Sequence, residues 1–219
     1  MFLFDMDGTL IESNRIWKDV DREFLARRGL PYTHAFYEGV AHTIMPKAAV
    51  FAKEHFHLPE SPEEIIAEAT GFADTDDEEI APVLHRCSRR TGVRAYLRQC
   101  KAEGRRMAVV TSSVPAHCHA ALKHLDLEKY FERIVLAHDL GLEKKDPAVW
   151  LHAAKACGVK PEDCTVFDDS IAACKGARAA KMRVVGVYDG YFAGDETEMR
   201  GFCDVYIKSF EELLYPPKK

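Results

Sequence analysis

The sequence lacks the features that mark several large classes of protein. No apolar run among its 219 residues approaches the roughly 18–20 residues that a helix needs to cross a bilayer. Its N-terminal segment carries Asp5 and Asp7, where a secretory signal peptide would carry basic and then apolar residues. It contains no internal repeat and no low-complexity tract. We therefore expect a cytoplasmic protein that neither enters a membrane nor is exported.

Disulfide patterns and a strong charge of either sign are also missing. The seven cysteines are an odd number without a Cys-x-x-Cys pair, which favours reduced and mostly buried thiols. Thirty Lys+Arg against 35 Asp+Glu give a net charge of −5, which argues against binding to nucleic acid or to an anionic membrane. What remains is an ordinary globular composition, 47% hydrophobic and 30% charged. We expect a monomer with one compact core and room for an accessory module.

From about Arg86 onward, short apolar strands alternate with amphipathic helices. Strands are expected at 107–110, 134–137, 165–167 and 183–187, and helices at 92–103, 115–125, 147–157 and 171–181. Such β-α-β alternation predicts a parallel sheet with helices on both faces, joined by right-handed crossovers. The predicted fold class is therefore α/β, with a doubly wound, Rossmann-like core.

The front of the chain departs from this alternation. An opening strand at 1–4 is followed by residues that show helical patterns, including one apolar stripe formed by Trp17, Val20, Phe24 and Leu25. A second helix is expected at 48–56, and Ser61, Pro62 and Glu64 are typical N-cap, N1 and N3 residues of a third. We predict an inserted helical cap domain at 13–83, with linkers near 12–14 and 76–82. The core domain would comprise 1–12 and 84–219.

The segment around Asp5 and Asp7 is the most informative part of the sequence. Residues two apart on a strand point to the same face, so these carboxylates would lie side by side where the first strand ends. Ligands of parallel α/β sheets bind at that edge, and Gly8 lets the chain turn sharply there. Two such carboxylates repel each other unless one is protonated or a cation lies between them. The pair indicates a proton donor or a metal site, with a solvated acidic turn as the alternative.

Three later stretches place complementary chemistry near the ends of predicted strands. Residues 109–113 end a strand in hydroxyl groups before a helix, whose free N–H groups can bind an anion. Residues 141–147 bring two lysines to the start of a capped helix, and 166–170 end a strand in two aspartates. Taken singly, the first stretch is more typical of an ordinary helix N-cap and the second of a solvated basic turn. Four aspartates at one sheet edge require a divalent cation, and an oxygen-only site suits Mg2+.

Together these four stretches resemble the four motifs of the haloacid dehalogenase superfamily. Their order is Asp5-Met6-Asp7-Gly8-Thr9, a strand ending in Thr111, Lys144 ahead of Pro147, and Asp168-Asp169-Ser170. The resemblance covers nearly the whole chain and is closest to the phosphatase and phosphomutase branch with a helical cap between the first two motifs. It implies Mg2+-dependent hydrolysis of a small phosphomonoester, a sugar phosphate or similar metabolite. The dehalogenases of the superfamily lack an aspartate at the position of Asp7, which argues against cleavage of a carbon–halogen bond.

The resemblance also implies a role for each matching residue. Asp5 matches the nucleophile, which attacks phosphorus and becomes an aspartyl-phosphate. Asp7 matches the general acid and base, which protonates the leaving oxygen and then activates water. Thr111, with the backbone at Ser112, matches the phosphate-binding position.

The remaining implied roles concern charge. Asp168 and Asp169 match the acidic pair that holds Mg2+ together with Asp5 and the backbone carbonyl of Asp7. Lys144 matches the lysine that neutralises the nucleophile and the phosphoryl group. The family often has Lys-Pro-x-Pro where this chain has Lys144-Lys145-Asp146-Pro147, so Lys145 is an alternative to Lys144.

Two other functions share parts of this pattern. A sugar phosphomutase of the β-phosphoglucomutase type resembles the chain in all four motifs and differs mainly in how its cap protects the phosphoenzyme from water. A signalling module of the response-regulator type, switched by phosphorylation of an aspartate, also uses an acidic cluster, a hydroxyl and a lysine around Mg2+. The cap insertion and Asp7 speak against this second alternative, because Asp7 is placed to promote hydrolysis.

The substrate cannot be inferred from the predicted cap. Candidate specificity residues near its hinges and loops are Arg15, Trp17, Tyr37, Glu38, His42 and Lys47, each of which fits a structural or solvated role better. His117 and His119 lack the i, i+4 spacing of metal ligands on a helix, so we expect no transition-metal site there. The expected partner is a small phosphorylated metabolite.

Overall fold

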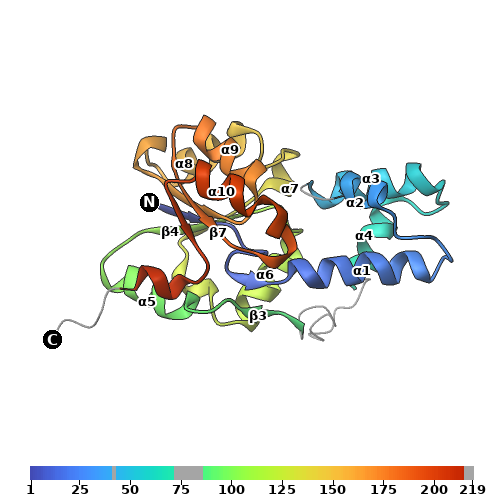
Figure 1. Ribbon diagram of the computed structural model, residues 1–219, viewed down its shortest axis with the longest axis horizontal. Coiled ribbons are helices and arrows are strands. Elements are labelled where there is room, and N and C mark those ends of the chain that lie inside the picture. Colours follow the sequence, from blue (N-terminus) through green and yellow to red (C-terminus); the bar gives the residue numbers. More distant parts are fainter. Residues whose placement is uncertain (41–42, 72–85, 215–219) are drawn as a thin grey trace.

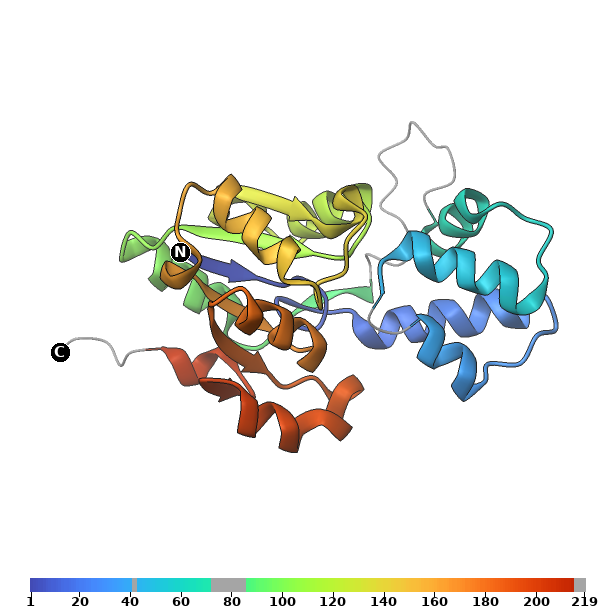
Figure 2. The ribbon, with the colours of Figure 1, turned by 90° about the horizontal axis from the view of Figure 1, so that it is seen from above.

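A computed structural model describes residues 1–40, 43–71 and 86–214. Its centre is a six-stranded parallel sheet in the order β5-β4-β1-β6-β7-β8 (Figures 1 and 2). The strands are β1 (Phe2–Phe4), β4 (Met107–Thr111), β5 (Arg133–Leu136), β6 (Thr165–Asp168), β7 (Arg183–Val187) and β8 (Val205–Ile207). The doubly wound α/β core predicted from the sequence is confirmed.

Helices cover both faces of this sheet because successive strand residues point to opposite sides. Phe4 and Phe167 belong to the apolar cluster under α5 and α6, whereas their neighbours Leu3 and Val166 belong to the cluster under α8, α9 and α10. The bounds are α5 (Val93–Ala102), α6 (Pro115–His124), α7 (Ala137–Leu140), α8 (Pro147–Ala156), α9 (Ile171–Ala179) and α10 (Glu196–Phe202). The helices and strands predicted after residue 92 agree with these bounds to within about two residues, the usual uncertainty at element ends.

Several short elements were not predicted. They are the antiparallel ribbon of β2 (Ile11–Glu12) and β3 (Ser88–Arg89), the edge strand β8, helices α2 (His34–Val40), α7 and α10, and the 3-10 segments η2 (Glu128–Tyr130), η3 (Pro161–Asp163), η4 (Gly190–Asp195) and η5 (Phe210–Leu213). Most are two to four residues long, too short for a hydrophobic period to develop. All seven cysteines are free and six are buried.

The first four helices gather at one end of the molecule, beyond the carboxyl edge of the sheet (Figure 1). They are α1 (Asn14–Ala26), α2 (His34–Val40), α3 (Met45–Phe56) and α4 (Pro62–Thr70). They share an apolar cluster of their own, which includes Phe24, Leu25, Phe36 and Ile65. An inserted helical cap is therefore present. The helix predicted at 48–56 is α3, which begins three residues earlier, at Met45.

Helix α1 belongs to both parts of the molecule. Ile16 lies in the apolar cluster of the core, with Trp17 packed against it, whereas Phe24 and Leu25 lie in the cap cluster. The apolar stripe that we assigned to the cap is thus divided between two packing partners. The predicted cap boundary at residue 13 stays a prediction, and the linker expected at 76–82 lies outside the described residues.

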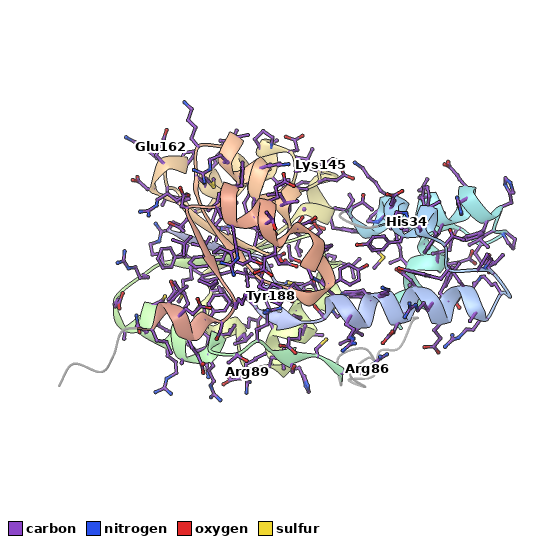
Figure 3. The ribbon with its side chains drawn as sticks, viewed as in Figure 1. His34, Arg86, Arg89, Lys145, Glu162 and Tyr188 are labelled. Atoms are coloured by element: carbon purple, nitrogen blue, oxygen red, sulfur yellow. The ribbon has the colours of Figure 1, made fainter. Side chains whose placement is uncertain are left out.

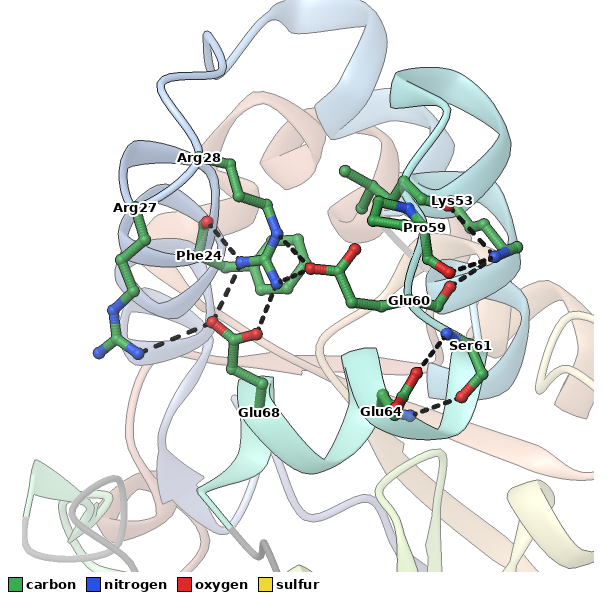
Figure 4. Close-up of polar contacts among 10 residues, drawn as sticks. Phe24, Arg27, Arg28, Lys53, Pro59, Glu60, Ser61, Glu64 and Glu68 are labelled. Atoms are coloured by element: carbon green, nitrogen blue, oxygen red, sulfur yellow. Dashed lines mark hydrogen bonds and ion pairs between the residues drawn. The ribbon is translucent and has the colours of Figure 1, made fainter.

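An ion-pair cluster around Arg28 ties α1 to α4 (Figure 4). The guanidinium Nη2 lies 2.7 Å from Glu60 and 2.6 Å from Glu68, and it is only 17% exposed. The capping box predicted at the start of α4 is confirmed, because Ser61 and Glu64 each bond the backbone N–H of the other. None of the helices in the described part of the chain has the length and apolar character of a membrane span.

Candidate active site

Three neighbouring strands bring the motif residues to one edge of the sheet. Asp5 follows β1, Thr111 ends β4 and Asp168 ends β6, and both β4 and β6 pair with β1. All three strands run parallel, so their carboxyl ends meet at the same edge, where ligands of such sheets bind. Asp5, Thr111 and Asp168 are residues at most 3% exposed, and they line one cavity.

Lys144 lies between two of the carboxylates. Its Nζ donates to Asp5 Oδ1 at 2.5 Å and to Asp168 Oδ2 at 2.8 Å. Burial opposes the charged form of Lys144, but Asp168 and Asp5 outweigh it and raise the pKa of the ammonium group above its ordinary range. The lysine is therefore a permanent positive charge at the sheet edge.

The backbone of the Lys144 loop is held close to α9 and α8. Trp150 Nε1 donates to the Lys144 carbonyl oxygen at 2.7 Å. A Cβ at Gly176, in α9, would lie 2.2 Å from the same oxygen, so only glycine permits this approach. The neighbouring Lys145 is 63% exposed and pairs with Glu143 at 2.6 Å, on the surface of the core (Figure 3). Of the two lysines that the sequence left open, the structure brings Lys144 to the aspartates.

The third carboxylate, Asp169, is oriented by the turn that follows β1 and by α1. Thr9 Oγ1 donates to Asp169 Oδ1 at 3.2 Å, and Asn14 Nδ2 donates to Oδ2 at 2.8 Å. Gly8, at a φ of 81°, makes this approach possible, because a Cβ there would lie 2.2 Å from both Asn14 Nδ2 and Asp169 Oδ2. Gly8 is thus needed for two reasons: it adopts a positive φ, and it has no Cβ that would collide with Asn14 and Asp169.

Asp5, Asp168 and Asp169 form a group that fits a hard divalent cation. One carboxylate oxygen of each lies within 4.8 Å of the others, and all three side chains are buried. Burial raises the pKa of Asp5 to about 7, against the opposing effect of Lys144. Burial, then the charges of Asp5 and Asp168, raises the pKa of Asp169 well above its ordinary value. A cation would relieve this repulsion, and oxygen-only ligands suit Mg2+.

The Asp7 carboxylate lines the same cavity and accepts three hydrogen bonds. Ser13 Oγ donates at 2.6 Å and Trp17 Nε1 at 3.1 Å to its Oδ1, and Ser113 Oγ donates to its Oδ2. The buried ring of His117 lies near the Asp7 carboxylate, with His117 Nε2 4.0 Å from Asp7 Oδ1. Burial lowers the pKa of His117, although the charge of Asp7 opposes that effect. Residues from the core and from α1 therefore position Asp7 jointly.

Hydroxyl groups lie opposite Lys144, at the start of α6. Thr111 Oγ1 accepts from the backbone N–H of Ser113 at 3.1 Å, and Ser112 lines the cavity with both. The ten-residue helix α6 begins at Pro115, so its positive end faces this loop. Hydroxyls, a helix N-terminus and a lysine are groups that bind a phosphoryl group.

The cavity, of about 200 Å3, lies between the sheet edge and the helical cap. Trp17 is the one member of our candidate cap residues found among its lining side chains in the described part of the chain. Lys47 pairs with Glu143, Tyr37 packs against Tyr191, Arg15 and Glu38 are exposed, and His42 lies outside the described residues.

Sequence reasoning missed several cavity residues, namely Asn14, Asp21, Thr43, Met45 and Tyr191. The i, i+3, i+7 spacing of Asn14, Trp17 and Asp21 along one helix face is a signal that could have revealed three lining residues of α1 together.

The model of the haloacid dehalogenase-like hydrolase family matches residues 1–181. The chain belongs to this family. It is an enzyme of the hydrolase class with the family's doubly wound core and inserted helical cap.

Named relatives extend this assignment. Fructose-1-phosphate phosphatase YqaB of Escherichia coli is 30% identical over 189 residues, which cover 84% of this chain and 94% of that protein. Hexitol phosphatase B of Escherichia coli is 27% identical over 216 residues, which cover 96% of this chain and 92% of that protein. A Thermotoga maritima structure described as that of a candidate β-phosphoglucomutase has a TM-score of 0.69 and 25% identity, and the match covers 97% of this chain and 95% of that chain.

Proposed function

We propose that this hydrolase is a Mg2+-dependent phosphatase that cleaves a small phosphomonoester, a sugar phosphate or similar metabolite, through an aspartyl-phosphate on Asp5. The observation that carries the proposal is the arrangement around Asp5. Its buried carboxylate accepts from Lys144 at 2.5 Å, lies within 4.8 Å of Asp168 and Asp169, and faces a cavity lined by Thr111. The named phosphatase activities of two relatives on fructose 1-phosphate and hexitol phosphates support the substrate class.

In the first half of the reaction, a carboxylate oxygen of Asp5 attacks phosphorus, and the bond from phosphorus to the ester oxygen breaks. Lys144 and the hydroxyl of Thr111 bind the phosphoryl oxygens and stabilise the charge that develops on them. Asp7 gives its proton to the leaving oxygen, so an alcohol departs rather than an alkoxide. A Mg2+ ion held by Asp5, Asp168 and Asp169 would offset the repulsion between the anionic nucleophile and the anionic ester.

In the second half, water attacks the phosphorus of the aspartyl-phosphate. Asp7, now ionised, takes a proton from this water, and inorganic phosphate leaves as the Asp5 carboxylate is restored. The hydrogen bonds from Ser13, Trp17 and Ser113 orient Asp7 for both transfers. The cap helices cover the cavity and limit access of other water molecules.

The test is phosphate release from a panel of phosphorylated sugars and polyols plus an aryl phosphate, with Mg2+ and with a chelator. We expect metal-dependent release by the native chain and at least about a 10⁴-fold loss in Asp5→Asn, which keeps the shape of the side chain but removes the nucleophile. Asp19→Asn, an exposed aspartate of α1, is the matched control and should be as active as the native chain. Full activity of Asp5→Asn with an unchanged melting temperature would refute covalent catalysis at this residue.

A phosphomutase is the second candidate, favoured by the similarity to the Thermotoga maritima structure. Incubation with a hexose 1-phosphate separates the two activities. Conversion to the 6-phosphate without free phosphate would identify a mutase, whereas stoichiometric phosphate supports the phosphatase.

A further inference from the structure

One face of α1 runs along the cavity from the metal-binding end outwards. Asn14, Trp17 and Asp21 are spaced i, i+3 and i+7, which places them on the same side of the helix, and all three line the cavity. Asn14 donates to Asp169 and Trp17 donates to Asp7. The first two residues of this row therefore orient side chains that belong to the proposed catalytic machinery.

Asp21 is different, because its carboxylate makes no hydrogen bond or ion pair with any residue in the three described ranges. The neighbouring cations of α1 lie over aromatic rings near Asp21 and form no ion pair with it among the described residues. Lys18 Nζ lies 5.8 Å from the centre of the Tyr191 ring, and the Arg22 guanidinium lies 5.3 Å from that of Tyr32. Within the described part of the chain, Asp21 is thus a cavity-lining carboxylate whose oxygens can accept hydrogen bonds from a ligand.

Its position is at the far end of the cavity from the phosphoryl site. A helix rises 1.5 Å per residue, so the backbone of Asp21 lies roughly 10 Å along the axis from that of Asn14, which contacts Asp169. Both lysines of the cavity are at the other end, where Lys144 pairs with Asp5 and Lys145 pairs with Glu143. An extended phosphorylated compound of five or six carbons is long enough to reach from the phosphoryl site to Asp21.

Aromatic rings surround this end of the cavity. Tyr191, from η4 of the core, lines it together with Asp21, and its ring packs edge-on against Tyr37 of the cap at 5.7 Å. Burial raises the pKa of Asp21 to about 7. Burial, and after it the nearby charge of Asp21, raises the pKa of Tyr32. A carboxyl group beside aromatic rings suits a ligand with hydroxyl groups and C–H faces, because the carboxylate accepts from hydroxyls and the rings cover the carbons.

We propose that Asp21 is a specificity residue that accepts hydrogen bonds from the hydroxyl groups of the leaving group. The enzyme then prefers monophosphates of neutral, polyhydroxylated compounds to esters that carry a second anionic group. A carboxylate or phosphate at the distal end of a substrate would lie next to the Asp21 carboxylate, while both cavity lysines lie at the opposite end. Repulsion between the two negative charges would then exclude such a substrate. The proposal rests on the phosphatase function proposed above.

The experiment compares three substrates that differ at the distal end: a hexitol monophosphate, 6-phosphogluconate, whose six-carbon chain ends in a carboxylate, and an aryl phosphate without hydroxyl groups. For Asp21→Ala we expect kcat/KM on the hexitol phosphate to fall about 10- to 100-fold, mainly through KM, since a hydrogen bond to a charged group is lost. On the aryl phosphate the change should stay within about twofold, because that substrate makes no such bond. Asp21→Asn, which keeps one acceptor oxygen, should recover part of the hexitol phosphate activity and raise kcat/KM on 6-phosphogluconate severalfold.

Asp19→Ala is the matched control, because Asp19 lies on the same helix but is exposed and pairs with Arg86 at 2.8 Å. It should leave all three substrates unchanged. Equal losses on all three substrates in Asp21→Ala would overturn the proposal, as would an unchanged preference for the hexitol phosphate over 6-phosphogluconate in Asp21→Asn. If Asp21→Ala does not fold, as judged by its thermal melt, the preference of the near-isosteric Asp21→Asn decides. No release from any substrate by the native chain would instead refute the phosphatase function itself.

Discussion

The sheet and the helical cap are built and connected in different ways. The sheet is enclosed by two large apolar clusters, and the polar side chains at its carboxyl edge are tied to one another by short hydrogen bonds. The cap has one smaller cluster and a partly buried ion-pair network around Arg28. The difference indicates that the motif side chains are held in place by a well-packed sheet, whereas the cap, which has fewer apolar contacts, can move more easily to fit a substrate.

The two parts meet through polar contacts as well as through the apolar contacts of Ile16 and Tyr37. Glu143, in the Lys144 loop of the core, accepts from Thr43 Oγ1 at 2.6 Å and lies 3.4 Å from Lys47 Nζ. Trp17 and Asn14 add hydrogen bonds from α1 to Asp7 and Asp169. Such contacts can break and re-form without exposing much apolar surface, which is what a cover over a binding cavity requires.

Among substitutions that test this difference between core and cap, Asp7→Asn should lower kcat the most. Proton transfer by a positioned side chain contributes about 10²- to 10⁴-fold, so we expect kcat to fall by about 10³-fold on sugar and aryl phosphates alike. Rapid-quench measurement of the phosphoenzyme should show slower breakdown as well as slower formation. A breakdown rate equal to that of the native chain would contradict the role of Asp7 as the base.

The two lysines provide a matched pair within the core. Lys144→Ala removes the cation that binds Asp5 and Asp168, and kcat should fall by about 100-fold, the loss typical of a group that stabilises transition-state charge. Lys145→Ala, at a 63% exposed position, should stay within about twofold of the native chain. Steady-state kinetics on one substrate compares the two variants, and the reverse ranking would assign the role to Lys145.

Gly176→Ala tests whether the packing of the core positions the Lys144 loop. The new Cβ would lie 2.2 Å from the Lys144 carbonyl oxygen, so the loop must shift, and we expect a loss of about 1–3 kcal/mol in the free energy of unfolding with a lower kcat. Gly201→Ala, in α10, is the control, because nothing lies within 4 Å of its Cβ position. That variant should be neutral or slightly stabilising in urea unfolding. Equal stability of the two variants would show that the close approach at Gly176 is not required.

The smallest effect is expected at the contact between core and cap. In Glu143→Gln the pairing with Lys145 and Lys47 is lost, and KM for a sugar phosphate should rise about two- to fivefold while kcat is nearly unchanged. A change confined to kcat would place Glu143 with the chemistry rather than with cap closure.

The same variant has a pH signature. Although burial opposes it, hydrogen bonds from Lys145 and Thr43 lower the pKa of Glu143 from 4.5 to about 2. Its ionised form therefore stabilises the folded protein above about pH 4.5, and this contribution is lost as the pH falls towards 2. The difference in melting temperature between the native chain and Glu143→Gln should be largest at neutral pH and shrink through that window. A constant difference would contradict the shifted pKa.

Much of the fold followed from local patterns. The β-α alternation after residue 92 predicted the parallel sheet, because strand and helix periods differ and each segment is long enough to show its own. The capping box at Ser61 was recognisable since both of its hydrogen bonds lie within four residues of chain. Short edge elements such as β8 depend on neighbours that are distant in sequence, and no local period marks them.

The candidate site divides in the same way. The convergence of Asp5, Thr111 and Asp168 could be inferred because all three end parallel strands, and topology brings those ends together. Local sequence did not distinguish Lys144 from Lys145, which are adjacent in a loop whose conformation is set by Trp150 and Gly176. The contribution of α1 to the cavity was missed because the first turns of this helix pack against the core and its last turns pack against the cap, which its sequence pattern does not show.

The sequence by itself determined the doubly wound core, the helical insertion and the collection of four aspartates and a lysine at one sheet edge, since each depends on residue order and periodicity. Only the tertiary structure decided which lysine faces the aspartates, that Asp7 is shared between core and cap, and that Asp21 faces the cavity with no hydrogen bond or ion pair to another described residue. These outcomes depend on contacts between segments that are far apart in the chain, and the packing of the whole molecule selects them.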